Sequence, residues 1–179
     1  MRREIKSDSP LHVTLEHNTC WNMTVIDTPG LTGKAEDDAK TLELCKLATR
    51  LVVCVEKAQD WDSCITARFA RQFDAKSDRT LFVVSHFSTF IKSCPGTKEL
   101  NVWFGKSSAA TALDKVHFVT MSGGAGGGEL DALYRADMDL LEQMQYDLRY
   151  ERAIGFDKAR KAALDHVSEI LMRSGGRYF

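Results

Sequence analysis

Four consecutive residues near the start of the chain, Asp27-Thr28-Pro29-Gly30, combine an acid, a hydroxyl, a proline and a glycine. They end an apolar run that predicts a buried strand over Met23–Asp27. A carboxylate at a strand end can hold Mg²⁺ through water, because Mg²⁺ retains much of its hydration shell and prefers oxygen ligands. A glycine N–H can approach a terminal phosphate closely. Ordinary turn chemistry uses the same residue types, so the motif alone leaves both interpretations open.

A second group of polar residues, Ser85-His86-Phe87-Ser88, ends another apolar run. In a nucleotide-binding α/β sheet, groups that read the base are presented from such a strand end. A guanine-specific site needs a carboxylate that accepts two N–H bonds, whereas a serine accepts one at most. His86 could stack on a base, and it could equally be a surface histidine.

Neither glycine-rich stretch meets the requirements of a phosphate-cradling P-loop. For Gly33-Lys34 to end the P-loop pattern Gly-x-x-x-x-Gly-Lys-Ser/Thr, position 28 would have to be glycine and position 35 serine or threonine, but they are Thr28 and Ala35. The run 123–128 lies between a predicted strand and a predicted helix, but no lysine follows it. We interpret it as a flexible linker, and we predict no P-loop within this chain.

Three other groups of polar residues are predicted to be structural. Asp60-Trp61-Asp62 is typical of a solvated turn whose indole packs against the protein. His17 and Cys20 lack two further metal ligands at a suitable spacing. Basic residues recur through the C-terminal region and predict a solvated helix face; they are Arg149, Arg152, Lys158, Arg160 and Lys161.

The composition restricts the partners and the compartment. The 24 lysines and arginines nearly balance 25 aspartates and glutamates, so no global field favours nucleic acid. The five cysteines are odd in number and form no Cys-x-x-Cys pair, which is typical of reduced thiols inside the cell. No apolar run approaches the roughly 20 residues of a membrane span. We therefore expect a cytoplasmic chain, peripheral to a membrane at most.

The elements that must position these residues alternate between apolar runs and helical patterns. Strands are predicted at 11–15, 23–27, 51–55, 81–84 and 116–119, and the first two are predicted to form a hairpin. Helices are predicted at 41–49, after Ser63, at 130–144 and at 157–172, whereas 85–105 is predicted to be irregular apart from a short amphipathic piece near 100–104. The predicted fold class is α/β, a layered domain around a mostly parallel sheet. Residues 1–128 would form this domain, and residues 129–179 a helical segment packed on it.

Three segments in this order resemble the distal part of a dynamin-type GTPase domain, in which Asp-x-x-Gly is the third nucleotide signature. The segments are Asn22–Leu31, Leu51–Asp62 and Asp78–Val84. Within that superfamily the chain is most similar to the plant and algal dynamin-related proteins that constrict dividing plastids and peroxisomes. This narrower resemblance rests on Cys20-Trp21-Asn22, Glu56–Trp61 and Arg152–Arg160.

The resemblance implies a partial P-loop-GTPase-like fold, the cofactors GTP and Mg²⁺, and a role in membrane or organelle fission. Asp27 would hold Mg²⁺ through water, Gly30 would bind the γ-phosphate, and Thr28 would belong to the same switch. Ser85, His86 and Ser88 would occupy the base-reading loop, where the family has Thr-Lys-x-Asp.

The family's partners and location are also implied. GTPase domains of the family dimerise with one another across the nucleotide face. The resemblance also implies microtubules as a further partner. Contact with a membrane would be indirect, at the surface of a plastid or peroxisome.

Three departures from the family limit the expected activity. The P-loop and the first switch threonine would lie before Met1, the base-reading loop is altered, and no stalk follows Phe179. We therefore expect this chain alone to hydrolyse GTP poorly or not at all. One alternative is a degenerate GTPase-like binding module that pairs with an intact dynamin-related partner through the surface near Gly30–Lys40. Another is an incomplete product of a longer gene, without a function of its own.

Overall fold

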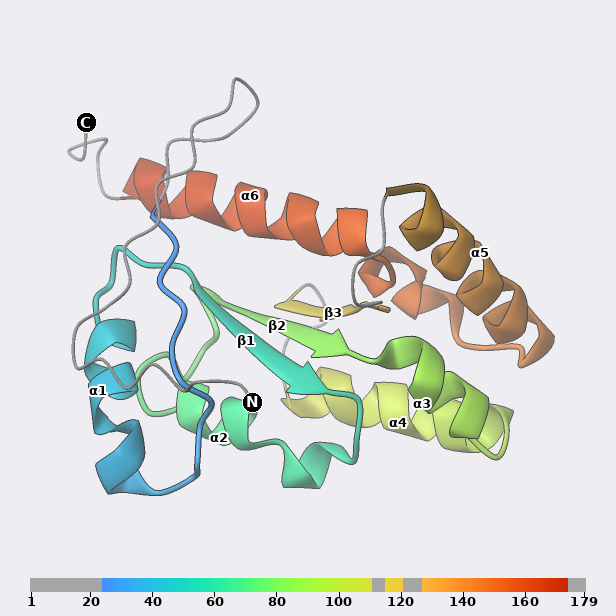
Figure 1. The fold of residues 1–179 in the computed structure, drawn as a ribbon, viewed down its shortest axis with the longest axis horizontal. Helices are drawn as coiled ribbons and strands as arrows, with labels where there is room; N and C mark the ends of the chain where they lie inside the picture. The colour runs from blue at the N-terminus through green and yellow to red at the C-terminus, as the bar shows by residue number, and fades with distance from the viewer. Residues whose placement is uncertain (1–23, 111–114, 121–126, 174–179) are drawn as a thin grey trace, which may run out of the picture.

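A parallel sheet of three strands lies between helices in the computed structural model, which describes residues 24–110, 115–120 and 127–173 (Figure 1). The strand order is β1 (Val52–Lys57), β2 (Thr80–Ser85) and β3 (Val116–Phe118). Both neighbouring pairs are parallel, with Cys54 opposite Phe82 and Phe82 opposite Val116. Parallel strands need a crossover, and helices supply each one here. The α/β class and the parallel sheet are therefore confirmed.

The crossovers pack against one face of the sheet. The first contains the short 3₁₀ helix η1 (Trp61–Ser63) and α2 (Ile65–Ala70). The second contains α3 (Phe87–Ser93) and α4 (Thr97–Ala110). Their apolar side chains join those of β2 and β3 in one core cluster. Figure 1 shows α2 and α4 along one side of the sheet and the long helix α6 (Phe156–Arg173) along the other.

An aromatic group forms the centre of this core. Phe87, Phe104 and Phe118 have no solvent-exposed side-chain area, and the ring centroid of Phe118 lies 5.4 Å from that of Phe87 and 5.0 Å from that of Phe104. Trp103 lies 5.2 Å from Phe118 by the same measure. Each buried ring contributes roughly 1.5–3 kcal/mol by removal from water, and each pair adds about 0.5–1.5 kcal/mol.

The prediction of an irregular segment over 85–105 was wrong, because α3 and α4 occupy most of it. Buried residues recur at helical spacing in both helices: Phe87 and Ile91 in α3, and Leu100, Phe104 and Ser107 in α4. The turn at Cys94-Pro95-Gly96 separates two short periodic stretches, and this hides the period in the sequence.

The prediction of a buried strand over Met23–Asp27 was also wrong for the described residues 24–27. These residues form no regular element, and Val25 and Ile26 are 79% and 49% exposed. A strand is stabilised by a ladder partner and by a covered face, and neither is recorded for this segment within the described residues. The predicted hairpin partner, Leu11–Leu15, lies outside the part of the chain that the structure describes.

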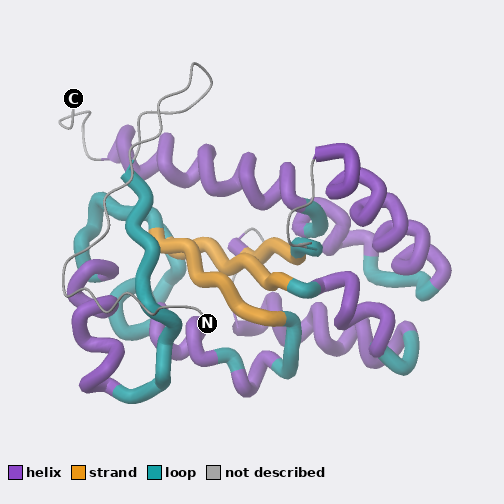
Figure 2. Tube along the Cα trace, in the orientation of Figure 1, coloured by secondary structure: helices purple, strands orange, loops and turns teal. Residues whose placement is uncertain are grey.

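The first described helix, α1 (Ala35–Cys45), begins before the predicted helix over 41–49. Its first turn carries Glu36, Asp37 and Asp38, whose charges favour a helix N-terminus through the helix dipole. Figure 2 shows that the segment leading into α1 is loop throughout. Helix α1 therefore begins six residues before the predicted start at Thr41.

The C-terminal region consists of α5 (Gly127–Gln143), the 3₁₀ helix η3 (Leu148–Ala153) and α6. Both predicted long helices are thus present, with shifted ends. Helix α5 contacts α3, and α6 contacts β3. The N–H of Gly155 donates to the Phe118 carbonyl at 2.9 Å, which ties the start of α6 to the sheet. Gly155 has φ +115°, and a Cβ there would lie 3.0 Å from the Tyr134 ring, so this position favours glycine.

These contacts join the C-terminal helices to the sheet, while the division into residues 1–128 and 129–179 stays a prediction. The predicted glycine-rich linker lies mostly outside the described residues. Among the helices that the structure describes, none combines the length and apolarity that crossing a membrane requires.

The cysteines of the described residues carry free thiols, as predicted: Cys45, Cys54, Cys64 and Cys94. Cys54 and Cys64 are buried. Burial raises the pKa of the Cys54 thiol to about 12, and neighbouring Cys45 and Cys64 add to the shift. Cys54 is therefore a protonated core side chain at neutral pH.

The turn before β2 is held by one carboxylate. Asp74 is 9% exposed and accepts bonds from the N–H groups of Asp78 and Arg79, each at 3.0 Å. The Thr80 hydroxyl donates to it at 2.6 Å. Burial alone would raise the pKa of Asp74, but these hydrogen bonds, with the nearby Arg79 charge, outweigh it and lower the pKa below the ordinary value of 3.8.

We expect Asp74→Asn to lower the free energy of unfolding by about 1.5–3 kcal/mol, since the amide cannot accept all three bonds. The lowered pKa means that the carboxylate's contribution is complete above the unfolded pKa and is lost as the pH falls through the folded pKa. Urea unfolding of both proteins should therefore give the largest difference near neutral pH and a smaller one at about pH 3. Asp139→Asn, at an exposed position of α5, is the control. An equal difference at both pH values would contradict this account.

Candidate nucleotide site

The carboxyl ends of the three strands meet at one edge of the sheet. Lys57 pairs with Ser85, and Val84 with Phe118, so β1, β2 and β3 all end within one residue of these positions. In open parallel sheets, ligands bind in the crevice outside this edge. The predicted base-reading residues leave β2 there.

Ser85 is engaged inside the protein at this edge. It is 6% exposed, and its hydroxyl donates to the Glu56 carbonyl at 2.9 Å, while its oxygen lies 3.1 Å from Nδ1 of His86. His86 is exposed and has φ 59°, in the left-handed region that is uncommon for residues other than glycine. Of these two predicted residues, His86 alone presents its side chain to solvent.

Hydrogen bonds connect the other end of the loop to the residues that follow β3 and, through them, to α5. Phe87 is fully buried, and its N–H donates to the Val119 carbonyl at 3.3 Å. The Ser88 N–H donates to the Thr120 hydroxyl oxygen at 3.0 Å. That hydroxyl in turn donates to the carboxylate of Asp137, which is 3% exposed. A chain of hydrogen bonds therefore fixes the backbone of this loop.

The predicted phosphate-binding motif lies on the exposed loop before α1. Asp27 and Gly30 are exposed and Thr28 is half-buried. A Cβ built on Gly30 would meet no atom within 4 Å, so a ligand has room to approach its backbone. No hydrogen bond that occupies the Asp27 carboxylate is recorded within the described residues. These groups are available to a ligand.

Asp38 of α1 fixes the backbone that follows the motif. Its carboxylate accepts the N–H of Thr32 at 2.9 Å and that of Gly33 at 3.0 Å, and it also lies 3.2 Å from the Thr32 hydroxyl. Asp38 is 8% exposed, and Gly33 has φ 78°. The turn is thus anchored to the helix it introduces.

The best-formed hollows of the described residues do not join the two predicted halves of the site, because none of them is lined by both the Asp27–Gly30 motif and the Ser85–Ser88 loop. The outer side of β1 is open in the same part of the chain, because Val53 and Val55 are 46% and 57% exposed and the strand pairs only with β2.

The acidic-tryptophan turn is structural, as predicted. Trp61 is 8% exposed, with its ring centroid 5.7 Å from that of Trp103. The Lys106 ammonium lies 3.1 Å from Asp60 and 3.0 Å from Asp62. Hydrogen bonds to the two carboxylates raise the pKa of Lys106, and the bond to Asp62 has the larger effect. These ion pairs are too exposed to contribute much to the stability of the fold.

Comparison with known proteins identifies the family. Residues 2–87 match the model of the dynamin family. Dynamin-like protein A of Dictyostelium discoideum is 31% identical over 178 residues, which cover 89% of this chain and 20% of that protein. The chain contains part of a dynamin-superfamily GTPase domain.

Two further dynamin-like relatives agree. Dynamin-like protein ARC5 of Arabidopsis thaliana is 26% identical over 184 residues, covering 87% of this chain and 23% of that protein. Dynamin-like protein B of Dictyostelium discoideum is 23% identical over 224 residues, covering 96% of this chain and 27% of that protein. The chain thus spans about a quarter or less of the length of these dynamin relatives. No solved structure matches it significantly.

The resemblance to a partial dynamin-type GTPase domain is therefore confirmed, and the plant protein among the relatives supports the narrower likeness. The family match includes the Asp27–Gly30 motif and ends at Phe87, within the loop that is predicted to read the base. The roles of the individual residues stay predictions.

Three residues that shape the candidate site were missed in the sequence: Asp38, Thr120 and Asp137. Asp38 had a local signal, since an acid in a first helical turn after a glycine often accepts backbone N–H groups. Thr120 and Asp137 are 17 residues apart and meet only because α5 folds back past the end of β3. Spacing in the sequence gives no such signal.

We expect Thr120→Val to loosen the base-reading loop of this dynamin-type domain. The Ser88 N–H would lose its acceptor and the buried Asp137 its donor, at a cost of about 2 kcal/mol in unfolding free energy. Amide hydrogen exchange at Ser88 should accelerate by about tenfold or more. Thr89→Val, at an exposed position of α3, controls for the loss of a hydroxyl. Unchanged protection at Ser88 would show that this bond does not hold the loop.

Proposed function

We propose that the chain contributes the γ-phosphate and Mg²⁺ side of a GTP site in a dynamin-type mechanoenzyme, and that the whole protein works in membrane or organelle fission. The supporting observation is the Asp27–Gly30 motif, whose Asp27 and Gly30 are exposed, within a partial dynamin-superfamily GTPase domain. Its place of action would be the cytoplasmic surface of an organelle, with plastids and peroxisomes as the candidates.

The residues of the motif fit Mg²⁺ and a terminal phosphate. Asp27 offers an exposed carboxylate, Thr28 a hydroxyl and Gly30 an unobstructed N–H. Within the described residues no cluster of three His, Cys, Asp or Glu side chains forms a metal cage. A single carboxylate acting through water is the usual protein contribution at a nucleotide-bound Mg²⁺. When bound, Mg²⁺ would neutralise charge on the phosphates.

The base-reading loop fits guanine poorly. It offers no carboxylate to accept the two guanine N–H groups, the Ser85 hydroxyl is bonded to Glu56, and the Ser88 N–H to Thr120. The exposed imidazole of His86 can stack on any base. We therefore propose weak base selectivity and little or no GTP hydrolysis by this chain alone.

A second candidate is a binding module that pairs with an intact dynamin-related GTPase domain through the surface around Gly30–Lys40. The observation in its favour is the loose packing of α1, in which Asp38 is the buried residue. Leu44 is 37% exposed and Leu47, just after the helix, 49%. A hollow of about 230 Å³ also separates α1 from α2. Self-association and contact with microtubules are family properties that this candidate shares.

We expect Asp27→Ala to abolish the Mg²⁺-dependent part of GTP binding, because the carboxylate is the hard oxygen ligand of the motif. Titration calorimetry with GTP in the presence of Mg²⁺, and again with a chelator, measures that part. Asp131→Ala, at an exposed position of α5, should bind like the parent chain. A parent chain without Mg²⁺-dependent binding, or an unchanged Asp27→Ala titration, would remove the proposed role.

The binding-module candidate is distinguished from the GTP-site proposal by mixing the chain with an intact dynamin-type GTPase domain. We expect the module to form a complex by size-exclusion chromatography that Leu44→Asp weakens, since a charge would then be buried in the interface. Val102→Asp, at an exposed position of α4, is the matched control. Absence of a complex would eliminate this candidate.

A further inference from the structure

An open hollow of about 890 Å³ lies between η3 and α6, far along the chain from the proposed GTP motif. His117 of β3 and Ala162 of α6 form part of its wall. Four basic side chains border it: Arg149, Arg152, Lys158 and Lys161. None of the residues proposed to bind GTP or Mg²⁺ contributes to it.

Helical geometry explains why the four cations converge. A 3₁₀ helix has about three residues per turn, so Arg149 and Arg152 project from the same side of η3. Lys158 and Lys161 are three residues apart on α6 and share one face of that helix. The Gly155 turn, bonded to the Phe118 carbonyl, connects the two helices and sets the two basic pairs around one space.

Charge is locally unbalanced in this hollow. Four cations line the hollow with two carboxylates, Glu151 and Asp165, and Asp147 pairs with Arg149 at 2.6 Å, which leaves one positive charge in excess. Lys161 pairs with Asp165 at 2.5 Å, but both side chains are more than half exposed, and such pairs exchange readily for a better partner. Arg152 and Lys158 have no carboxylate partner within the described residues.

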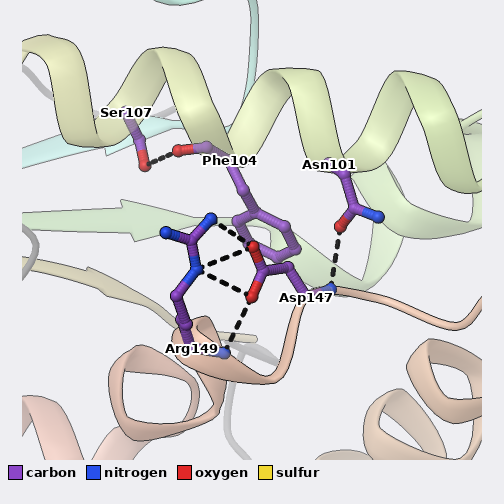
Figure 3. A network of polar contacts seen from close by, with 5 residues as sticks. All are labelled: Asn101, Phe104, Ser107, Asp147 and Arg149. Carbon is purple, nitrogen blue, oxygen red and sulfur yellow. Dashed lines mark hydrogen bonds and ion pairs between the residues drawn. The ribbon is translucent and has the colours of Figure 1, made fainter.

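Two of the cations are held in place by their surroundings. The Lys158 ammonium donates to the Glu151 carbonyl at 2.6 Å and lies 5.8 Å from the centroid of the Tyr134 ring. Arg149 donates to the Asp147 carboxylate through Nε and Nη2, and the Asp147 N–H donates to Asn101 of α4 at 2.8 Å. In Figure 3 the remaining terminal nitrogen of Arg149 is turned away from Asp147. That nitrogen stays available to a ligand.

We propose that this hollow binds a small anion that carries two or more phosphate groups. Guanidinium groups match phosphate oxygens in a two-pronged geometry, and ammonium groups add point charges. The volume is that of a small-molecule site. The carboxylates of Glu151 and Asp165 interrupt the basic surface, which therefore suits a compact ligand rather than an extended polyanion. The phosphates can belong to a soluble polyphosphate or to a lipid headgroup.

The experiment measures binding of pyrophosphate and inositol hexakisphosphate to the full chain by titration calorimetry. We expect Arg152→Gln and Lys158→Gln each to weaken binding by about tenfold, since each removes a cation without a carboxylate partner. Arg160→Gln is the matched control, because Arg160 is exposed on α6 but does not line the hollow. Arg152→Lys keeps the charge but loses the two-pronged guanidinium geometry, so it should bind more weakly than the parent chain and more tightly than Arg152→Gln. Thermal unfolding of each variant reports whether the fold is intact.

Vesicles distinguish the two sources of phosphate. Phosphatidylcholine vesicles with about one phosphatidylinositol bisphosphate in twenty lipids test for a headgroup, and vesicles with phosphatidylserine test for charge alone. If the parent chain sediments with the phosphatidylinositol bisphosphate vesicles and Lys158→Gln does not, the ligand is a lipid headgroup. If the chain binds the soluble anions but does not sediment with these vesicles, the ligand is a soluble polyphosphate. Both outcomes support the proposal. Absence of binding to either anion, or an equal loss in Arg160→Gln, overturns it. Asp27→Ala should leave this binding unchanged, so the proposal is tested independently of the GTP motif.

Discussion

The burial of Phe118 is the interaction on which most of this structure depends. Its ring contacts the aromatic side chains of α3 and α4, and its backbone carbonyl accepts the N–H that begins α6. One residue of a three-residue strand thus joins the sheet, both crossover helices and the C-terminal region. The residues that follow, Val119 and Thr120, hold the base-reading loop through Phe87 and Ser88. The residue before it, His117, lines the basic hollow. The predicted base-reading loop and the basic hollow are therefore positioned by the same buried strand.

The two edges of the sheet differ sharply in how they are covered. β3 is enclosed by α6 on one face and by the aromatic group on the other, whereas β1 leaves Val53 and Val55 in contact with water. Parallel strands are usually covered on both faces, so the β1 side is the unusual one. The loop that carries Asp27 and Gly30 is also open to water, since Val25 and Ile26 are exposed. Its groups can meet a ligand because little else in the described residues holds them.

Membership of the dynamin superfamily and the chemistry of this chain's residues are separate matters. A fold can keep its architecture while the groups at its site change, and function has to be argued from those groups. Here Asp27 and Gly30 of the predicted phosphate motif are exposed, while the polar atoms of the predicted base-reading loop are largely turned inward. The basic hollow adds a second place for phosphate chemistry, built from helices that follow the family-matched region.

The sequence by itself determined the α/β class, the three described strands, the long C-terminal helices and the family, because buried β-branched runs and local motifs depend on neighbours along the chain. It could not determine whether residues 24–27 form a strand, since a strand exists only where a partner and a covered face are present. It also missed α3 and most of α4, of which it indicated only the amphipathic piece near 100–104, because their periods are short and separated by Pro95. The sequence could not predict the hydrogen bonds that link Ser88 to Thr120 and Thr120 to Asp137. Nor could it predict that Arg152 and Lys158 line one hollow. Those juxtapositions arise from how helices fold back onto the sheet, and only the tertiary structure decides them.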